Sequence, residues 1–335
     1  VHFTGQQKPW HFWHKVVHPH SYLFPRYAGL ADCPWGFRFK LFIKYFRCHQ
    51  PPLNDQTRKS SNAFLRDSTP RPLTPADLRK AQLLQLKILH EIRRVCYKHS
   101  LQFFLIGGSL LGAVRHDGFI PWDDDLDVAM LRDDYERFLE IAPSELSGEY
   151  WMQHWENDLT YGHLFAKVLL KNTRWNIAGA ENVIARRGLY VDIFPFDRIP
   201  SKPKEQKKHY RMVKSVRRLL RLKTNYEIKQ KNWYLTVRQK FLSIYASLLP
   251  LWKIHSRIRA VYREGHRLAD DQNPVCTAIG ANYYGSARPE KMFRELVLHR
   301  FEDDEFPIPR DFDAILQHHY GDYMTLPPQN QRVVH

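Results

Sequence analysis

Cysteine is scarce in this sequence of 335 residues, and no Cys-x-x-Cys pair occurs. The 4 cysteines, which share no repeated spacing, are Cys33, Cys48, Cys96 and Cys276. A disulfide scaffold or a structural zinc site would need closely spaced pairs, so the sequence predicts neither. This usage of cysteine fits a reducing, cytoplasmic setting.

Long apolar runs are also missing. The longest run, at residues 241–252, lies between Lys240 and Lys253 and contains Pro250. A membrane-spanning helix needs about 20 apolar residues, so this run is too short to cross a bilayer. Its length favours a helix buried in a core, and its basic flanks leave a helix lying in a membrane interface as the alternative. No secretory signal is predicted, because residues 1–8 are polar and no apolar segment follows them.

Acidic residues are fewer than basic ones: the sequence has 35 Asp and Glu and 51 Lys and Arg, which gives a formal net charge of +16. Such a charge predicts an anionic partner, whether a nucleic acid, a phosphorylated substrate or an anionic membrane face. Much of the excess lies in a basic segment with helical composition at about residues 201–268. The content of 43% hydrophobic residues still suffices for one large core or two modest ones.

The composition divides the chain into three parts. Residues 1–50 are rich in aromatic residues and histidine, and residues 51–72 form a polar, proline-rich stretch that indicates a linker. The remaining residues, 73–335, begin with a predicted helix. Thr74 is its expected N-cap, and Pro75 its expected first residue.

Residues 73–335 show the pattern of an α/β (α+β) domain. The first helix is expected to end near residues 99–100, and further helices are expected at 109–114 and 134–141. Apolar segments of strand length are found at 101–106, 125–130, 164–170, 189–194 and 277–284. This alternation predicts a mixed β-sheet flanked by helices.

Every residue from Asp123 to Asp127 except Leu126 is an aspartate. Neighbouring carboxylates raise one another's pKa unless a cation compensates, and Mg²⁺ or Mn²⁺ does so when held by one or two carboxylates, water and substrate phosphates. Residues two apart on a strand share a face, so Asp125 and Asp127 are predicted to hold such a cation. Asp123 is a further candidate ligand if the strand begins early, whereas Asp124 should point away. A solvated acidic loop is the alternative, which the neighbouring apolar strand disfavours.

A glycine-rich turn precedes these acids. Gly107 and Gly108 would let backbone N–H groups approach a phosphate without obstruction by side chains. Ser109 adds a hydroxyl donor at the start of the helix that follows. The sequence therefore predicts a phosphate site beside the cation site.

The segment 107–127 resembles the signature of the LicD family, which includes phosphocholine transferases of bacterial surface glycans and the fukutin-related proteins. Later segments that fit the family pattern, in the family's order, are 165–167, 172–173, 188–195 and 301–328. The resemblance begins near residue 73 and extends to the end of the chain. It implies a nucleotidyltransferase-like fold with a basic helical insertion at about 201–268.

The resemblance also implies roles for individual residues. Asp125 and Asp127 would be the paired metal ligands. Asp192, at the end of a predicted strand, would be a third carboxylate ligand or the base that takes a proton from the attacking hydroxyl. Lys167 and Arg115 are candidates for holding phosphate oxygens, with a surface ion pair as an equal alternative.

Trp122 stands directly before the acids. Its ring would be able to stack on a nucleotide base or on a choline headgroup through cation–π attraction. Packing against the core is the favoured explanation for this side chain.

The activity implied by the resemblance is the Mg²⁺-dependent transfer of a phosphoryl-linked headgroup to a hydroxyl of a cell-surface glycan. The expected donor is CDP-choline, and the expected acceptor is a precursor of lipopolysaccharide, teichoic acid or capsule. A nucleotidyl or polyol-phosphate transferase on the same fold is an alternative. In this interpretation the basic segment 201–267 holds the enzyme against anionic lipid at the inner face of the membrane.

A basic nucleic-acid-binding protein is the alternative from another class. It is disfavoured because the basic residues lie outside the acidic segment and the aromatic residues lie mainly in apolar runs. No nucleic-acid partner is therefore expected.

The first ten residues resemble a different family. They are similar to the H-x-x-G-x-x-K-P-W element at the C-terminal end of family 8 glycosyltransferases, and His2, Gly5 and Lys8 match it. In that family the His completes a Mn²⁺ site, and the Gly and the Lys contact the diphosphate of the sugar nucleotide. The resemblance implies that residues 1–50 are the remnant of an upstream glycosyltransferase domain of a longer, bifunctional polypeptide.

Overall fold

A computed structural model of the chain describes residues 74–175, 183, 185–226, 233–272, 274–279 and 281–332. The chain divides into two units, Val1–Pro72 and Leu73–His335, and the described residues belong to the second. The predicted glycosyltransferase remnant with His2, Gly5 and Lys8, and the predicted linker, lie outside the described residues.

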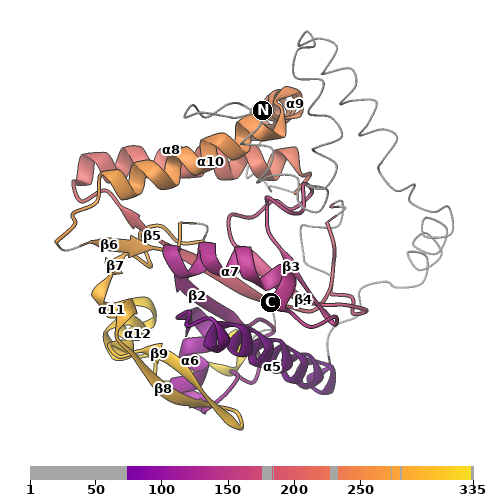
Figure 1. Ribbon diagram of the computed structural model, residues 1–335, viewed down its shortest axis with the longest axis vertical. Helices are drawn as coiled ribbons and strands as arrows, with labels where there is room; N and C mark the ends of the chain where they lie inside the picture. The colour runs from indigo at the N-terminus through magenta and orange to yellow at the C-terminus, as the bar shows by residue number, and fades with distance from the viewer. Residues whose placement is uncertain are drawn as a thin grey trace, which may run out of the picture. The chain divides into compact units, whose positions relative to one another are not determined.

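A mixed sheet of seven strands forms the centre of the described unit (Figure 1). The strand order is β1-β2-β5-β4-β3, with β6 paired to β5 and β7 to β6. The bounds are β1 Phe104–Leu105, β2 Asp127–Leu131, β3 Tyr150–Gln153, β4 Ala166–Leu170, β5 Tyr190–Ile199, β6 Val275–Thr277 and β7 Arg288–Pro289. Strands β2 and β5 are parallel, and the other pairs are antiparallel. A separate antiparallel hairpin joins β8 (Leu296–Phe301) to β9 (Asp304–Pro309).

Helices flank this sheet, which confirms the predicted mixed α/β class. Their bounds are α5 Pro75–Lys98, α6 Gly107–His116, α7 Arg132–Glu145, α8 Pro203–Lys223, α9 Trp233–Leu248, α10 Leu251–Arg267, α11 Lys291–Arg294 and α12 Phe312–Tyr320. A short 3₁₀ helix follows at Gln329–Gln331. Helices α5 and α7 contact each other and the sheet, while α10 contacts β5 and α8.

The first helix begins and ends as predicted. The Thr74 hydroxyl accepts a hydrogen bond from the backbone N–H of Asp77, Pro75 is the first helical residue, and His99 is the C-cap. Apolar side chains at helical spacing, Ile88 and Ile92 among them, are fully buried. Their burial fixes α5 against the sheet.

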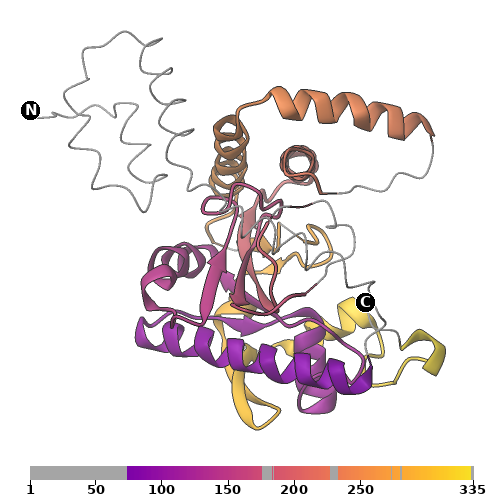
Figure 2. The same cartoon turned by 90° about the vertical axis from the view of Figure 1, so that its right-hand side faces the viewer.

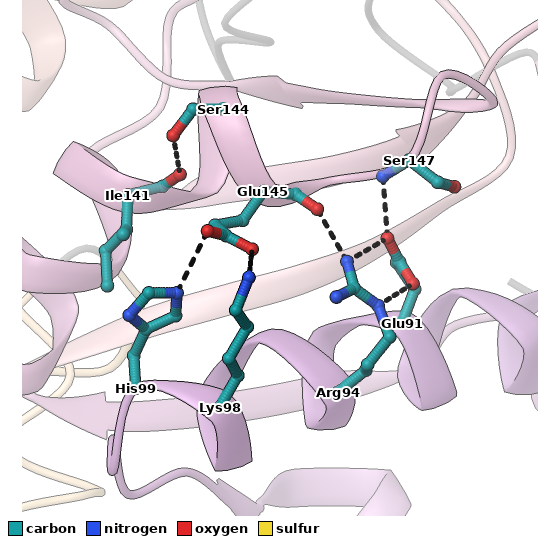
Figure 3. Close-up of polar contacts among 8 residues, drawn as sticks. All are labelled: Glu91, Arg94, Lys98, His99, Ile141, Ser144, Glu145 and Ser147. Carbon is teal, nitrogen blue, oxygen red and sulfur yellow. Dashed lines mark hydrogen bonds and ion pairs between the residues drawn. The ribbon is translucent and has the colours of Figure 1, made fainter.

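Polar contacts hold the C-terminal halves of α5 and α7 together (Figure 3). Arg94 binds both carboxylate oxygens of Glu91 and donates to the backbone carbonyl of Glu145 at 2.5 Å. Lys98 pairs with the Glu145 carboxylate at 2.8 Å, and the backbone N–H of Ser147 donates to Glu91 at 2.7 Å. Glu91 therefore connects α5 to the segment just after α7 from a largely buried position.

Three boundaries near the predicted phosphate turn differ from the sequence prediction. The strand expected at 101–106 is paired only over Phe104–Leu105. The next helix starts at Gly107, two residues before its predicted start. Its first residue has a positive φ of 56°, which glycine adopts readily. Strand β2 begins at Asp127, so Asp125 lies in the preceding loop. The alternation of side chains along a strand therefore does not determine the direction of the Asp125 side chain.

The strand expected at 277–284 is wrong. Strand β6 ends at Thr277, whose hydroxyl hydrogen-bonds to the backbone carbonyls of Asn282 and Tyr283. These bonds close a turn. The apolar residues Ala278, Ile279 and Tyr283 that follow Thr277 are buried in the hydrophobic cores and do not form a strand.

The basic segment is helical, as predicted, and forms α8, α9 and α10. Within it the expectation of a buried core helix at 241–252 is wrong. Pro250 separates α9 from α10, and Phe241 and Leu248 are exposed. Among the described helices, none has the length and apolar content that crossing a membrane demands.

Candidate functional site

The acidic loop before β2 is held by two buried glutamines of α5. Nε2 of Gln82 donates to the backbone carbonyls of Ile120 at 3.2 Å and Asp123 at 2.9 Å. Nε2 of Gln85 donates to the carbonyl of Asp124 at 2.9 Å. The sequence analysis missed both residues, although two glutamines on the apolar face of a helix are the signal that would have revealed them. These side chains hold residues 120–124, and at the end of the loop the backbone N–H of Asp192 in β5 donates to the carbonyl of Leu126 at 3.0 Å.

The first turn of α6 packs directly against the acids. A Cβ atom on Gly108 would lie 2.5 Å from Oδ2 of Asp123, and one on Gly107 would lie 3.5 Å from Oδ2 of Asp127. The Ser109 hydroxyl accepts a hydrogen bond of 2.8 Å from the backbone N–H of Asp127. The predicted turn and the predicted acids are therefore neighbours in the structure, and a Cβ at position 108 would force the Asp123 carboxylate to shift.

Three charged residues form a row across neighbouring strands. Asp127 of β2 pairs with Asp192 of β5 in the parallel register, and Asp192 pairs with Lys167 of β4 in the antiparallel register. Residues opposite each other on adjacent strands share a face of the sheet, so all three side chains point to one side. The row places Asp192 between Asp127, the first residue of β2, and the Lys167 ammonium.

The ion pair of Lys167 is buried rather than at the surface. Its Nζ lies 2.5 Å from Oδ1 of Asp192, and both residues are less than 10% exposed, at 4% and 8%. The same Nζ lies 3.3 Å from the centroid of the Tyr190 ring. Carboxylate and ring hold this cation in a fixed place, because an ammonium over an aromatic face is attracted to its electrons.

The carboxylates of the site are harder to ionise than isolated ones. Burial, followed by the nearby Asp125, raises the pKa of Asp123 to about 8. Burial, Asp125 and Asp192 raise the pKa of Asp127 well above its usual value, and Lys167 opposes this. Burial raises the pKa of Asp192 to about 6, although Lys167 lowers it. Such a concentration of negative charge favours a positively charged ligand at this place.

The donor set fits a hard cation such as Mg²⁺, because every candidate ligand is a carboxylate oxygen. Among the residues that the structure describes, no three side chains of His, Cys, Asp or Glu converge on one point as a complete metal site would require. A cation here would be held by one or two carboxylates, and water and substrate oxygens would fill its other positions. Asp123, Asp125 and Asp127 are only half-buried, which leaves room for such ligands.

The structure places Arg115 and Trp122 against the C-terminal segment. Nη1 of Arg115 donates to the backbone carbonyl of Tyr323 at 2.8 Å. The Trp122 ring lies 5.2 Å from the guanidinium of Arg332 and meets the His116 ring edge-on. Both residues border the acidic loop, and their contacts with phosphate and base stay predictions.

Tyr320 is a further residue that the sequence analysis missed as part of the site. It ends α12, and burial together with the carboxylates of Asp123, Asp127 and Asp125 raises its pKa to about 12. The phenol is thus neutral at physiological pH, and the residue keeps 44% of its surface exposed. The sequence signal that could have identified Tyr320 was its position within the segment 301–328, which fits the LicD family pattern.

Comparison with known proteins identifies the family. Residues 100–254 match the family model described as LicD/FKTN/FKRP, nucleotidyltransferase domain. The chain is 31% identical over 267 residues to the lipopolysaccharide cholinephosphotransferase LicD of Haemophilus influenzae, and this covers 77% of the chain and 95% of that enzyme. It is also 33% identical over 75 residues to an uncharacterized protein of Rickettsia typhi, which covers 22% of the chain and 24% of that protein.

The matched family domain contains the glycine turn, the acidic loop and the row from Asp127 to Lys167. The likeness to the Haemophilus influenzae enzyme extends over nearly the full length of that enzyme. Together they confirm the family that the signature predicted. The chain belongs to the LicD family.

Proposed function

We propose that the protein is a cholinephosphotransferase that moves phosphocholine from CDP-choline to a hydroxyl of a lipopolysaccharide-type glycan. The observation that carries the proposal is the row of Asp127, Asp192 and Lys167 facing the glycine turn. The likeness to the Haemophilus influenzae enzyme supports phosphocholine as the transferred group and lipopolysaccharide as the acceptor. The buried, free Cys96 and Cys276 agree with a reducing, cytoplasmic location.

In the proposed reaction the acceptor hydroxyl oxygen forms a bond to the phosphorus of the phosphocholine unit. The bond from that phosphorus to the oxygen of CMP breaks, and CMP leaves with the bonding electrons. Asp192 accepts the hydroxyl proton, since a carboxyl with a pKa of about 6 is ionised at neutral pH yet more basic than an ordinary aspartate. Lys167 holds Asp192 in position through the 2.5 Å ion pair.

A divalent cation held by Asp125 and Asp127 would neutralise charge on the donor phosphates. The backbone N–H groups at Gly107 and Gly108 bind phosphate oxygens at the N-terminus of α6, where the helix dipole is positive. The Ser109 hydroxyl keeps the backbone of Asp127 against this turn. Each of these contacts acts by position and charge, which is what transfer of a phosphoryl group requires.

The proposal is tested with the full chain, CDP-choline, Mg²⁺ and a lipopolysaccharide acceptor that lacks choline. Release of CMP and incorporation of choline are measured for the wild type, Asp125→Asn and Asp127→Asn. We expect both variants to lose turnover by about 100-fold or more. Asp303→Asn, which changes an exposed acid of the β8–β9 turn, serves as the control and should keep wild-type turnover.

Equal turnover in all four proteins would contradict the proposed mechanism. Incorporation of the CMP unit into the acceptor, with phosphocholine as the leaving group, would instead indicate a nucleotidyl transferase. Incorporation of another phosphate-linked group in preference to choline would indicate the polyol-phosphate alternative.

A further inference from the structure

Helix α9 carries an apolar face that no described element covers. Its large apolar side chains recur at helical spacing and are 42% to 77% exposed: Val237, Phe241, Ile244, Tyr245 and Leu248. We call these five residues the α9 stripe. Soluble proteins seldom expose a contiguous apolar surface of this kind unless it binds something.

The opposite side of α9 is the one that joins the fold. Ala246 is fully buried, and Leu249, just after the helix, packs into the core between α8 and α10. Figure 2 shows α9 passing over α8, on the side of α8 that is turned away from the sheet, and meeting α10 where the chain turns. The stripe is therefore available while the helix stays anchored.

Basic side chains border the stripe on both edges. At 100° per residue, Arg238 falls beside Tyr245 on one edge and Lys240 falls beside Ile244 on the other. Both are exposed, and within the described part of the chain no carboxylate forms an ion pair with either. Helix α9 contains no acidic residue, and α8 beneath it carries a single one, Glu205, among many Lys and Arg.

We propose that α9 is an interfacial helix, whose stripe enters the headgroup region of an anionic lipid bilayer while Arg238 and Lys240 bind the lipid phosphates. An apolar face with aromatic residues, bordered by Lys and Arg, is the pattern of helices that lie in a membrane interface. The charge of the neighbouring helices adds attraction to the same surface. A spanning helix is not involved.

A second copy of the chain is a poorer occupant of the stripe. In a two-fold dimer the same patch meets itself, so the basic edges of one α9 would face the basic edges of the other. With no acid on the helix to compensate, such a pairing is repelled. An anionic bilayer complements both the stripe and its borders.

The test uses the full chain and sedimentation with vesicles, and it does not depend on the proposed transfer reaction. Vesicles of phosphatidylcholine alone are compared with vesicles that contain one quarter phosphatidylglycerol. We expect binding to the anionic vesicles, weakened as the salt concentration rises. Phe241→Ser with Leu248→Ser should weaken it by about tenfold or more, because both apolar contacts are lost. Arg238→Gln with Lys240→Gln should weaken it by about fivefold per residue.

Matched controls change similar side chains elsewhere on the surface. Leu83→Ser with Leu298→Ser removes two exposed apolar residues, and Lys80→Gln with Lys291→Gln removes two exposed charges. These variants should bind as the wild type does. Because Phe241 and Leu248 are exposed, all variants should keep the wild-type thermal midpoint, which is measured in parallel.

The proposal is overturned if the wild type does not bind the anionic vesicles, or if either α9 variant binds as tightly as its control. A wild-type dimer that Phe241→Ser with Leu248→Ser converts to a monomer, with vesicle binding unchanged, would assign the stripe to a second copy instead. Slower hydrogen exchange of residues 237–248 on addition of anionic vesicles alone would support the proposal directly.

Discussion

Gly108 and Asp123 approach so closely that no side-chain carbon fits between them: a Cβ at position 108 would lie 2.5 Å from Oδ2 of Asp123 and would displace that carboxylate. The two residues come from the start of α6 and from the acidic loop. No backbone strain is involved at Gly108, since its φ is not positive. The requirement is space for the carboxylate.

Gly108→Ala is therefore expected to lower turnover by about tenfold or more while leaving the fold intact. Alanine favours a helix over glycine by about 0.5–1 kcal/mol, so the loss of activity should not come with a large loss of stability. Choline incorporation and urea unfolding are measured together. Gly148→Ala, where a Cβ would meet nothing within 4 Å, is the control. Full activity of Gly108→Ala would show that Asp123 has room to move without consequence.

Lys167→Met should move the pH dependence of the reaction. Lys167 lowers the pKa of Asp192, which burial raises to about 6. Without the cation this pKa rises further, so the pH below which the base is protonated and inactive moves upward. The acid limb of kcat/KM against pH is expected near pH 6 in the wild type and at least about one unit higher in the variant.

The control for this shift is Lys171→Met, which removes an exposed lysine that donates to the carbonyl of Gly148. Its acid limb should coincide with that of the wild type. An unmoved limb in Lys167→Met would mean that Asp192 is not the base.

Gln82→Leu is expected to disorder the acidic loop without unfolding the domain. It removes the donor that binds the carbonyls of Ile120 and Asp123 and leaves them with one partner fewer. The expected cost is about 1–3 kcal/mol of stability and a larger loss of turnover at saturating donor. Gln102→Leu changes an exposed glutamine and should do neither. Stability lost without any change in turnover would limit Gln82 to a structural role.

Glu91→Gln should lower the stability of the domain relative to the wild type, and this loss should be larger at neutral pH than at acid pH. The hydrogen bond from Arg94, opposed by burial and assisted by Ser147, lowers the pKa of Glu91 in the folded protein (Figure 3). A lowered pKa contributes stability above the unfolded value of about 4.3, and this contribution disappears as the pH falls through the folded pKa.

The expected difference between the Glu91 variant and the wild type is about 2 kcal/mol at pH 7, shrinking below about pH 4. Urea unfolding at several pH values measures it. Glu140→Gln, on the exposed side of α7, should show no such trend. A difference that is constant with pH would contradict the assignment to the charge of Glu91.

Local patterns in the sequence were enough to predict α5, the helical basic segment and the neighbourhood of the glycine turn and the acids. They did not predict that Asp192 lies between Asp127 and Lys167. That arrangement depends on the register of β2, β5 and β4, which is set by long-range packing. The partners of Gln82 could not be predicted for a similar reason, because the carbonyls of Ile120 and Asp123 are distant from it in the sequence.

Periodicity was misleading where an apolar surface is exposed. Residues 241–252 have the composition of a core helix, and composition cannot show which face of a helix lacks a neighbour. The break between the two helices lies at Pro250, which cannot continue a helix, whereas the exposure of Phe241 depends on how α9 packs on α8. A pattern of apolar residues predicts that the apolar face of a helix packs against another element. For the α9 stripe, the described part of the chain contains no such element.

The contact of the C-terminal segment with Arg115 of α6 sets the order in which this part of the domain is completed during synthesis. The aspartates leave the ribosome early, whereas Tyr320 and the carbonyl of Tyr323 that binds Arg115 leave it some 200 residues later. A chain that stops before this point carries the acids and Arg115 without the Tyr323 carbonyl. The contact between α6 and the C-terminal segment is therefore among the last parts of the domain that synthesis can complete.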